Sequence, residues 1–202
     1  MKLLHIDASI LGKQSVSRQL TAAIVKRLFA LNPAAEVAYQ DLAAEPAGHL
    51  STDEFMAFQG VEPQDDATKR DSTRNAQWLD QFLAADVIVV GAPMYNFSLP
   101  TQLRAWLDRL AVPGKSFRYD ANGVEGLAGG KRVIVASTRG GMYGEGSPMA
   151  ALDYQETYLR GFLGFLGITD ITFIRAEGLG LGAESRAAAI DAAVAEAARL
   201  AA

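Results

Sequence analysis

The chain has 202 residues, of which 50% are hydrophobic and 21% charged, and its formal net charge is −4 at pH 7. This size and composition predict a single globular domain spanning residues 1–202, and the acidic balance argues against nucleic acid as the main partner. No apolar run approaches the ~20 residues of a membrane span, so we expect no membrane partner either.

Scarce residue types exclude further classes of site. The chain has no cysteine, which removes disulfides, thiolate nucleophiles and Cys-ligated metals. Its two histidines, His5 and His49, lie far apart in the sequence, which disfavours a metal site or a Ser-His-Asp triad. Because Asp7 comes too early for a secretory signal peptide, a cytoplasmic protein without a metal is the simplest interpretation.

The first unit reads as a strand, a hydroxyl-rich loop and a helix. Residues 2–7 predict the strand, and apolar residues at helical spacing after Ser17 predict the helix. A helix N-terminus offers free N–H groups to a phosphate, and the hydroxyls of Ser9, Ser15 and Ser17 would add donors, with charge from Arg18. Plain capping by Ser15 or Ser17 explains the same residues equally well. The loop lacks both the Walker and the Gly-x-Gly-x-x-Gly patterns.

Residues 36–85 contain a strand, an excursion and a helix. Residues 36–41 alternate and predict the second strand. Residues 42–72 predict an excursion with a short helix that starts near Ser51. This excursion would either cover the site or meet a partner subunit, or else form a surface loop without a role. Residues 73–85 predict the helix.

The centre of the chain is the stretch 84–110. Residues 87–90 are β-branched and predict a strand buried on both faces, which Gly91 and Pro93 would stop. Pro100 would open a helix with an apolar face. The loop between them carries Tyr95 and Phe97 at the carboxyl end of a strand, which is where open α/β sheets bind ligands.

The last third predicts two more strands. Residues 112–130 are glycine-rich and predict no element. Residues 131–136 predict a strand, followed by a loop with adjacent Gly140 and Gly141, which would let a backbone approach a flat ligand or form a turn with positive φ. Residues 150–166 predict a helix and residues 168–176 the last strand, with Ile171, Phe173 and Ala176 on one face. Residues 183–202 predict the closing helix.

Alternating strands and helices predict an α/β fold with a doubly wound, five-stranded parallel sheet and helices on both faces. In the strand order 2-1-3-4-5, the loops after the first, third and fourth strands would meet at one edge. One of these loops suits a phosphate and the other two suit a planar ring. A ring that carries one phosphate describes FMN.

Specific residues strengthen this interpretation through a family resemblance. One set resembles the signature of the flavodoxin-like quinone and azo reductases: Gly91, Pro93, Tyr95, Asn96, Ser98, Pro100, Leu103, Arg104, Asp108 and Arg109. The serines of the first loop and the stretches 94–97 and 138–141 follow in the order expected of FMN-dependent NADH:quinone oxidoreductases, also called FMN-dependent NADH-azoreductases. The resemblance covers nearly the whole chain.

The resemblance implies a flavodoxin-like homodimer with two active sites at the subunit interface. It implies cofactor-binding residues around the FMN phosphate and ribityl chain, at one edge of the isoalloxazine and on its other side: Ser9, Ser15, Val16 and Ser17; Pro93, Met94, Tyr95, Asn96 and Phe97; Thr138, Arg139, Gly140 and Gly141. It also implies three residues at the substrate face: Tyr119, Phe162 and Tyr143.

In the mechanism that the resemblance implies, NADH or NADPH passes a hydride to flavin N5 and leaves, and a quinone or azo compound then receives two electrons. The cofactor carries this ping-pong chemistry, so no side chain need act as a catalytic nucleophile. One alternative is a flavodoxin-type electron carrier that does not oxidise NAD(P)H directly. Another is a non-catalytic α/β binding module in which Tyr95 and Phe97 only pack against the core.

Overall fold

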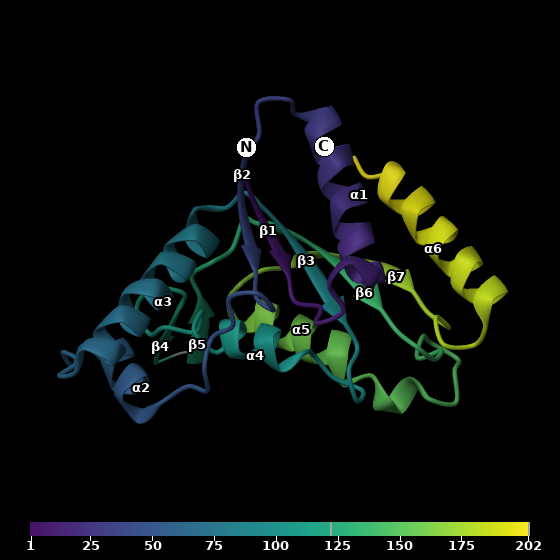
Figure 1. Ribbon diagram of the computed structural model, residues 1–202. Coiled ribbons are helices and arrows are strands. Elements are labelled where there is room, and N and C mark those ends of the chain that lie inside the picture. The colour runs from purple at the N-terminus through teal and green to yellow at the C-terminus, as the bar shows by residue number, and fades with distance from the viewer. Residues whose placement is uncertain (122, 202) are drawn as a thin grey trace.

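The computed structural model describes residues 1–121 and 123–201. Five strands form one parallel sheet in the order β2-β1-β3-β6-β7 (Figure 1). The strands are β1 (Lys2–Asp7), β2 (Glu36–Asp41), β3 (Val87–Pro93), β6 (Arg132–Thr138) and β7 (Asp170–Ala176). Counted within the sheet, this order is 2-1-3-4-5, so the flavodoxin-like topology that the sequence predicts is confirmed.

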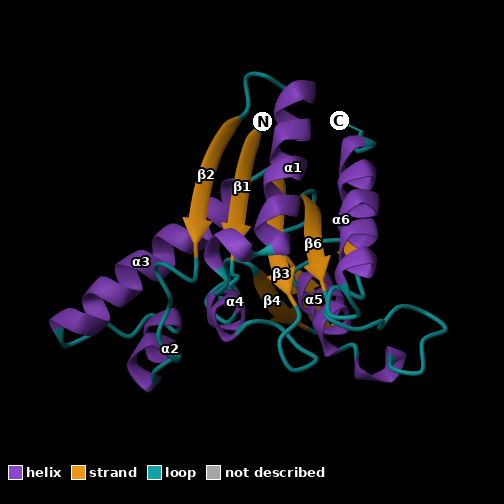
Figure 2. Ribbon diagram, turned by 45° about the vertical axis from the view of Figure 1, so that its right-hand side comes forward, coloured by secondary structure: helices purple, strands orange, loops and turns teal. Residues whose placement is uncertain are grey.

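Helices cover both faces of the sheet (Figures 1 and 2). The helices α1 (Val16–Leu31) and α6 (Ala183–Ala198) pack on one face. The helices α3 (Asp66–Ala84), α4 (Thr101–Leu107) and α5 (Tyr154–Phe165) pack on the other. Alternation along each strand separates the two cores, because Ile88 and Val90 face α3 and α4 while Val87 and Val89 face α1.

The strand β3 runs further than its sequence predicts. It continues through Gly91 to Pro93, because β1 ends opposite Gly91 while β6 continues alongside. Met94 N donates to Thr138 O on β6 at 2.8 Å, so the proline nitrogen faces the side that β1 has already left. A proline is tolerated where its strand has an open edge.

Three other features differ from the sequence prediction. A hairpin, β4 (Phe117–Asp120) with β5 (Gly123–Gly126), lies in the stretch predicted to lack elements. Most of its residues are exposed, so its sequence has no alternation of apolar and polar residues that would predict strands. The helix α3 begins at Asp66, capped by Asp65, and its exposed polar first turns carry no apolar period. Ala176 faces the α6 side, opposite to Ile171 and Phe173.

The short helix α2 (Thr52–Phe58) begins with the capping box of Ser51 and Glu54, close to the predicted start. Within the described residues, no helix combines the length and apolar character needed to cross a membrane.

Candidate functional site

A cavity of about 240 Å³ lies at the carboxyl edge of the sheet, where the loops after β1, β3, β6 and β7 meet. Most of the predicted cofactor residues line it: Ser9, Ser15, Val16, Pro93, Met94, Tyr95, Thr138, Arg139 and Gly140. Four predicted residues do not: Ser17, Asn96, Phe97 and Gly141. The fold therefore brings the three predicted loops together at one cavity.

The N-terminus of α1 closes one end of this cavity. Ser15 caps the helix, since its Oγ accepts a hydrogen bond from Arg18 N at 3.3 Å, and a role of Ser15 toward a phosphate stays a prediction. Ser17 is buried and its hydroxyl bonds to Ser15 Oγ at 3.0 Å. The N–H groups of Val16 and Ser17, the first two residues of the helix, have no intrahelical acceptor. They are the donors that this end offers to an anion.

Arg18 fixes the loop instead of facing the cavity. Its guanidinium makes two hydrogen bonds of 2.7 Å to the Asp41 carboxylate and donates to Ser9 O at 2.9 Å. The hydrogen bond from Arg18 lowers the pKa of Asp41, and the same bond raises the pKa of Arg18. The guanidinium is thus committed to carboxylate and carbonyl partners, and its charge is not free for a phosphate.

The loop after β3 is a tight turn with an unusual backbone. Tyr95 and Ser98 exchange hydrogen bonds of 3.0 and 3.1 Å, and the two residues between them have positive φ, 48° at Asn96 and 70° at Phe97. Asparagine tolerates this region, but an aromatic residue is strained there. The Phe97 ring is nevertheless held out at the surface, 39% exposed. Strain of this kind concentrates at functional sites.

The same turn is linked to the first loop, because the Tyr95 hydroxyl and Ser9 Oγ lie 3.2 Å apart in a hydrogen bond. This hydrogen bond therefore ties the loop after β1, predicted to bind a phosphate, to the loop after β3, predicted to bind a planar ring.

The loop after β6 is joined by backbone hydrogen bonds to the loop after β7. Leu179 N donates to Arg139 O at 3.1 Å, and Gly180 N donates to Gly140 O at 2.9 Å. Neither Gly140 nor Gly141 has positive φ, so a turn requirement does not explain the pair. A Cβ at Gly140 would meet no protein atom within 4 Å, and because Gly140 lines the cavity, its missing side chain leaves room for a ligand.

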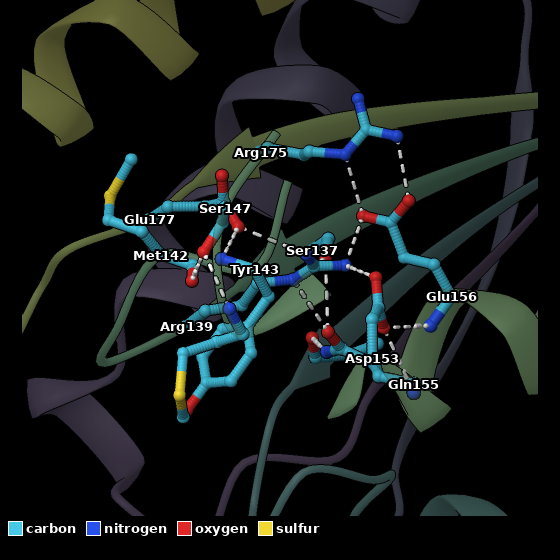
Figure 3. Close-up of polar contacts among 12 residues, drawn as sticks. Ser137, Arg139, Met142, Tyr143, Ser147, Asp153, Gln155, Glu156, Arg175 and Glu177 are labelled. Atoms are coloured by element: carbon cyan, nitrogen blue, oxygen red, sulfur yellow. Dashed lines mark hydrogen bonds and ion pairs between the residues drawn. The ribbon is translucent and has the colours of Figure 1, made fainter. Parts of the chain in front are cut away.

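Arg139 lies at the centre of a buried ion-pair network (Figure 3). Its side chain is 0% exposed and reaches three carboxylates, Asp153 at 2.8 Å, Glu156 at 2.6 Å and Glu177 at 3.0 Å. Glu177 also accepts a hydrogen bond from Tyr143 N at 2.8 Å. The guanidinium of Arg139 therefore binds protein groups, and what the residue presents to the cavity is its backbone.

The three predicted substrate residues lie in different places. The Tyr143 ring meets the Phe97 ring edge-on, with centroids 6.1 Å apart, and neither residue lines the cavity. Tyr119 is 73% exposed on the hairpin, and Phe162 stacks on Tyr158 with centroids 5.8 Å apart on α5. Neither Tyr119 nor Phe162 lines the cavity within this chain.

Five residues that the sequence analysis missed also line the cavity: Leu11, Gln14, Leu179, Gly180 and Arg186. A signal was available for the stretch 178–182, since it also leaves the carboxyl end of a strand and repeats glycine at alternate positions. Arg186 carried no signal because it lies in an ordinary helix.

Comparison with known proteins places the chain in a family. A family model described as a flavodoxin-like fold matches residues 1–201. The FMN-dependent NADH:quinone oxidoreductase of Sinorhizobium medicae is 58% identical over 190 residues, covering 94% of this chain and 92% of that protein. The protein of the same name from Bradyrhizobium sp. strain BTAi1 is 56% identical over 202 residues, covering 100% of both.

Solved structures agree with this placement. The azoreductase from Bacillus anthracis str. Sterne superposes with a TM-score of 0.88 at 29% identity, covering 98% of this chain and 97% of that chain. The chain therefore belongs to the flavodoxin-like family of FMN-dependent NADH:quinone oxidoreductases and azoreductases.

Proposed function

We propose that this oxidoreductase binds FMN, takes electrons from NADH or NADPH, and reduces quinones and azo compounds. One observation carries the proposal: a single cavity is lined both by the N-terminus of a helix and by two backbone loops suited to a planar ring. The names of the relatives support the same activity. When bound, FMN would supply the two-electron chemistry, which we propose to be a ping-pong hydride transfer through N5.

The residues fit a phosphorylated planar cofactor. At the phosphate end, the N–H groups of Val16 and Ser17 lack intrahelical acceptors, and the Ser15 hydroxyl lies beside them. At the ring end, the open position at Gly140 leaves room for a flat group. The cavity is smaller than the ~300–1,000 Å³ of a complete small-molecule site, so the outer part of the ring would rest on exposed residues such as Phe97.

The chain's own groups would orient the ring and hold its charge. Within residues 1–121 and 123–201, the backbone N–H groups of Gly140 and Gly141 donate no hydrogen bond to protein. Fixed N–H groups beside a ring stabilise the negative charge that reduction places on it. The carbonyls of these two glycines accept hydrogen bonds of 2.9 Å from Gly180 N and Gly178 N, so the donors would not need to reorganise when the charge appears.

A homodimer would complete the site. Large apolar side chains are exposed around the mouth of the cavity, including Ile10 at 60% and Leu181 at 65%, and apolar surface of this kind favours a partner. Tyr119 and Phe162 lie outside the cavity of their own chain and would cover the ring of the other subunit. Light scattering of the purified protein tests this, and a monomer would contradict it. A cytoplasmic location stays a prediction.

An absorption spectrum tests the function. The purified protein is incubated with FMN, desalted and then treated with NADH or NADPH under nitrogen. We expect a retained flavin spectrum that bleaches with a nicotinamide donor and returns when a quinone is added. Retained flavin that stays oxidised with both donors would favour an electron carrier, and a protein that retains no flavin would refute the proposal.

A further inference from the structure

One cationic side chain at the cofactor cavity has no partner among the described residues. Arg186, in the first turn of α6, lines the same cavity as Gln14 and Ser15 and is partly buried. Among the residues that the structure describes, its guanidinium makes no hydrogen bond, ion pair or stacking contact. A guanidinium carries five N–H donors, so all of them are available to a ligand.

Arg186 differs from the other arginines near the cavity in having no carboxylate partner among the described residues. Among the described residues, two charged residues line the cavity, Arg139 and Arg186, and the side chain of Arg139 is fully buried. The charge of Arg139 is offset by carboxylates at 2.6 to 3.0 Å, and Arg18, behind the first loop, is offset by Asp41. The uncompensated charge of the cavity therefore comes from Arg186, together with the positive end of α1.

The start of α6 fixes where this charge lies. Ser185 Oγ donates to Gly178 O at 3.0 Å, and Gly182 has the positive φ of 126° that turns the chain into the helix. The backbone of the loop before α6 is in turn bonded to the loop after β6, through Gly180 N and Gly140 O. Arg186 thus projects from a fixed helix end toward the cavity.

We infer that the Arg186 guanidinium binds the phosphate of the cofactor, opposite the N-terminus of α1. The planar guanidinium matches a phosphate with two parallel hydrogen bonds. The inference rests on the proposed function and goes beyond it, since it assigns the phosphate's counter-charge to the last helix of the chain. A flavin without phosphate would gain nothing from Arg186.

The experiment compares two ligands that differ only in the phosphate. The apoprotein is titrated with FMN and with riboflavin by quenching of flavin fluorescence, for the wild type, Arg186→Met and Arg186→Lys. Arg199→Met is the matched control, because Arg199 is the C-cap residue at the far end of the same helix. We expect Arg186→Met to weaken FMN binding about 10- to 100-fold, as for loss of a charged hydrogen-bond pair.

Riboflavin and the control variant Arg199→Met test whether the effect of Arg186 is specific to the phosphate. Riboflavin affinity should change less than twofold in Arg186→Met, and Arg186→Lys should recover part of the FMN affinity. The dependence of FMN affinity on salt should also become shallower in Arg186→Met, because one charge contact is lost. Arg199→Met should match the wild type for both flavins.

Other outcomes would overturn the inference. Equal weakening of FMN and riboflavin would show that Arg186 acts on the structure of the cavity. Unchanged FMN affinity with a raised KM for NADH or NADPH would assign Arg186 to the nicotinamide dinucleotide. If the wild type bound neither flavin, the proposed function itself would be refuted, which the wild-type titration alone reveals.

Discussion

Replacing Arg139 by Met should lower the free energy of unfolding by about 3 kcal/mol, because it removes the cation at the centre of a buried network. Breaking a buried ion pair from one side typically costs about 3–5 kcal/mol. The Arg139 side chain is fully buried, and it bonds to carboxylates from α5, its N-cap and the loop after β7. Methionine keeps much of the length of arginine but none of its donors.

The remaining partners of each carboxylate place the cost at the lower end of that range. Glu156 keeps Arg175, which donates to it at 2.8 and 2.7 Å. Glu177 keeps the bond from Tyr143 N, and Asp153 keeps its bonds from two backbone N–H groups at the start of α5. No carboxylate is left entirely without a donor, so the loss should approach 3 kcal/mol rather than 5.

Urea unfolding of the flavin-free protein at pH 7 measures this cost without depending on the proposed function. The matched control is Arg118→Met, which breaks the pair of Arg118 and Glu125 on the hairpin. That pair is equally short, 2.6 Å, but its side chains are 58% and 47% exposed. An exposed pair contributes about 0–1 kcal/mol. If Arg139→Met costs no more than Arg118→Met, burial of the network does not determine its energy and the reasoning is wrong.

Three further predictions concern the cavity, its turn and a second buried pair. Gly140→Val should leave the melting temperature of the apoprotein unchanged, because the added Cβ meets no protein atom. The same variant should weaken FMN binding at least about 10-fold in a titration. Gly48→Val is the control, since Gly48 has equal space but does not line the cavity, and weaker FMN binding by this control would contradict the prediction. Phe97→Gly should be more stable to urea than Phe97→Ala by about 1 kcal/mol, since glycine relieves the positive φ of 70°; equal stabilities would show that the turn is unstrained. Burial opposes ionisation of Glu54, but hydrogen bonds from Asn75, the Ser51 backbone and Arg109 outweigh it and lower its pKa. A lowered folded-state pKa gives stability that is present above the unfolded-state pKa of about 4.3 and is lost as the pH falls through the folded-state value. The difference in unfolding free energy between the wild type and Glu54→Gln should therefore be full at pH 7 and shrink below about pH 4, and a difference that grows on acidification would contradict the sign.

The sequence predicted the sheet because its central strands are buried and several of its helices carry an apolar face. Residues 87–90 could lie only between two apolar layers, and the regular alternation of elements left one topology class. The elements that it missed have too few buried residues to create a pattern. The hairpin around Tyr119 is mostly exposed, and the first turns of α3, from Asp66, are polar on all sides.

The site was predictable at the level of loops and less so at the level of charges. The three loops had to meet because parallel strands end at one edge. Which arginine would face the ligand depends on partners that are distant in sequence. Arg18 finds Asp41 at the end of β2, 23 residues away, and Arg139 finds Glu177 38 residues away. Sequence position favoured these two arginines, whereas the fold commits both to carboxylates and gives Arg186 no partner among residues 1–121 and 123–201.

This division of charge also determines how a ligand would lie in the cavity. A cation with a carboxylate at about 3 Å contributes little field beyond its own pair, so Arg18 and Arg139 set the shape of the loops without attracting an anion. The positive end of α1 and Arg186 both line the cavity, whereas the exposed ring of Phe97 lies outside its lining. An anionic group is therefore drawn into the cavity, and a flat apolar group is left toward the surface. A molecule with a phosphate and a planar ring has only one orientation that satisfies both preferences, which would present its ring, and not its phosphate, at the exposed mouth of the cavity.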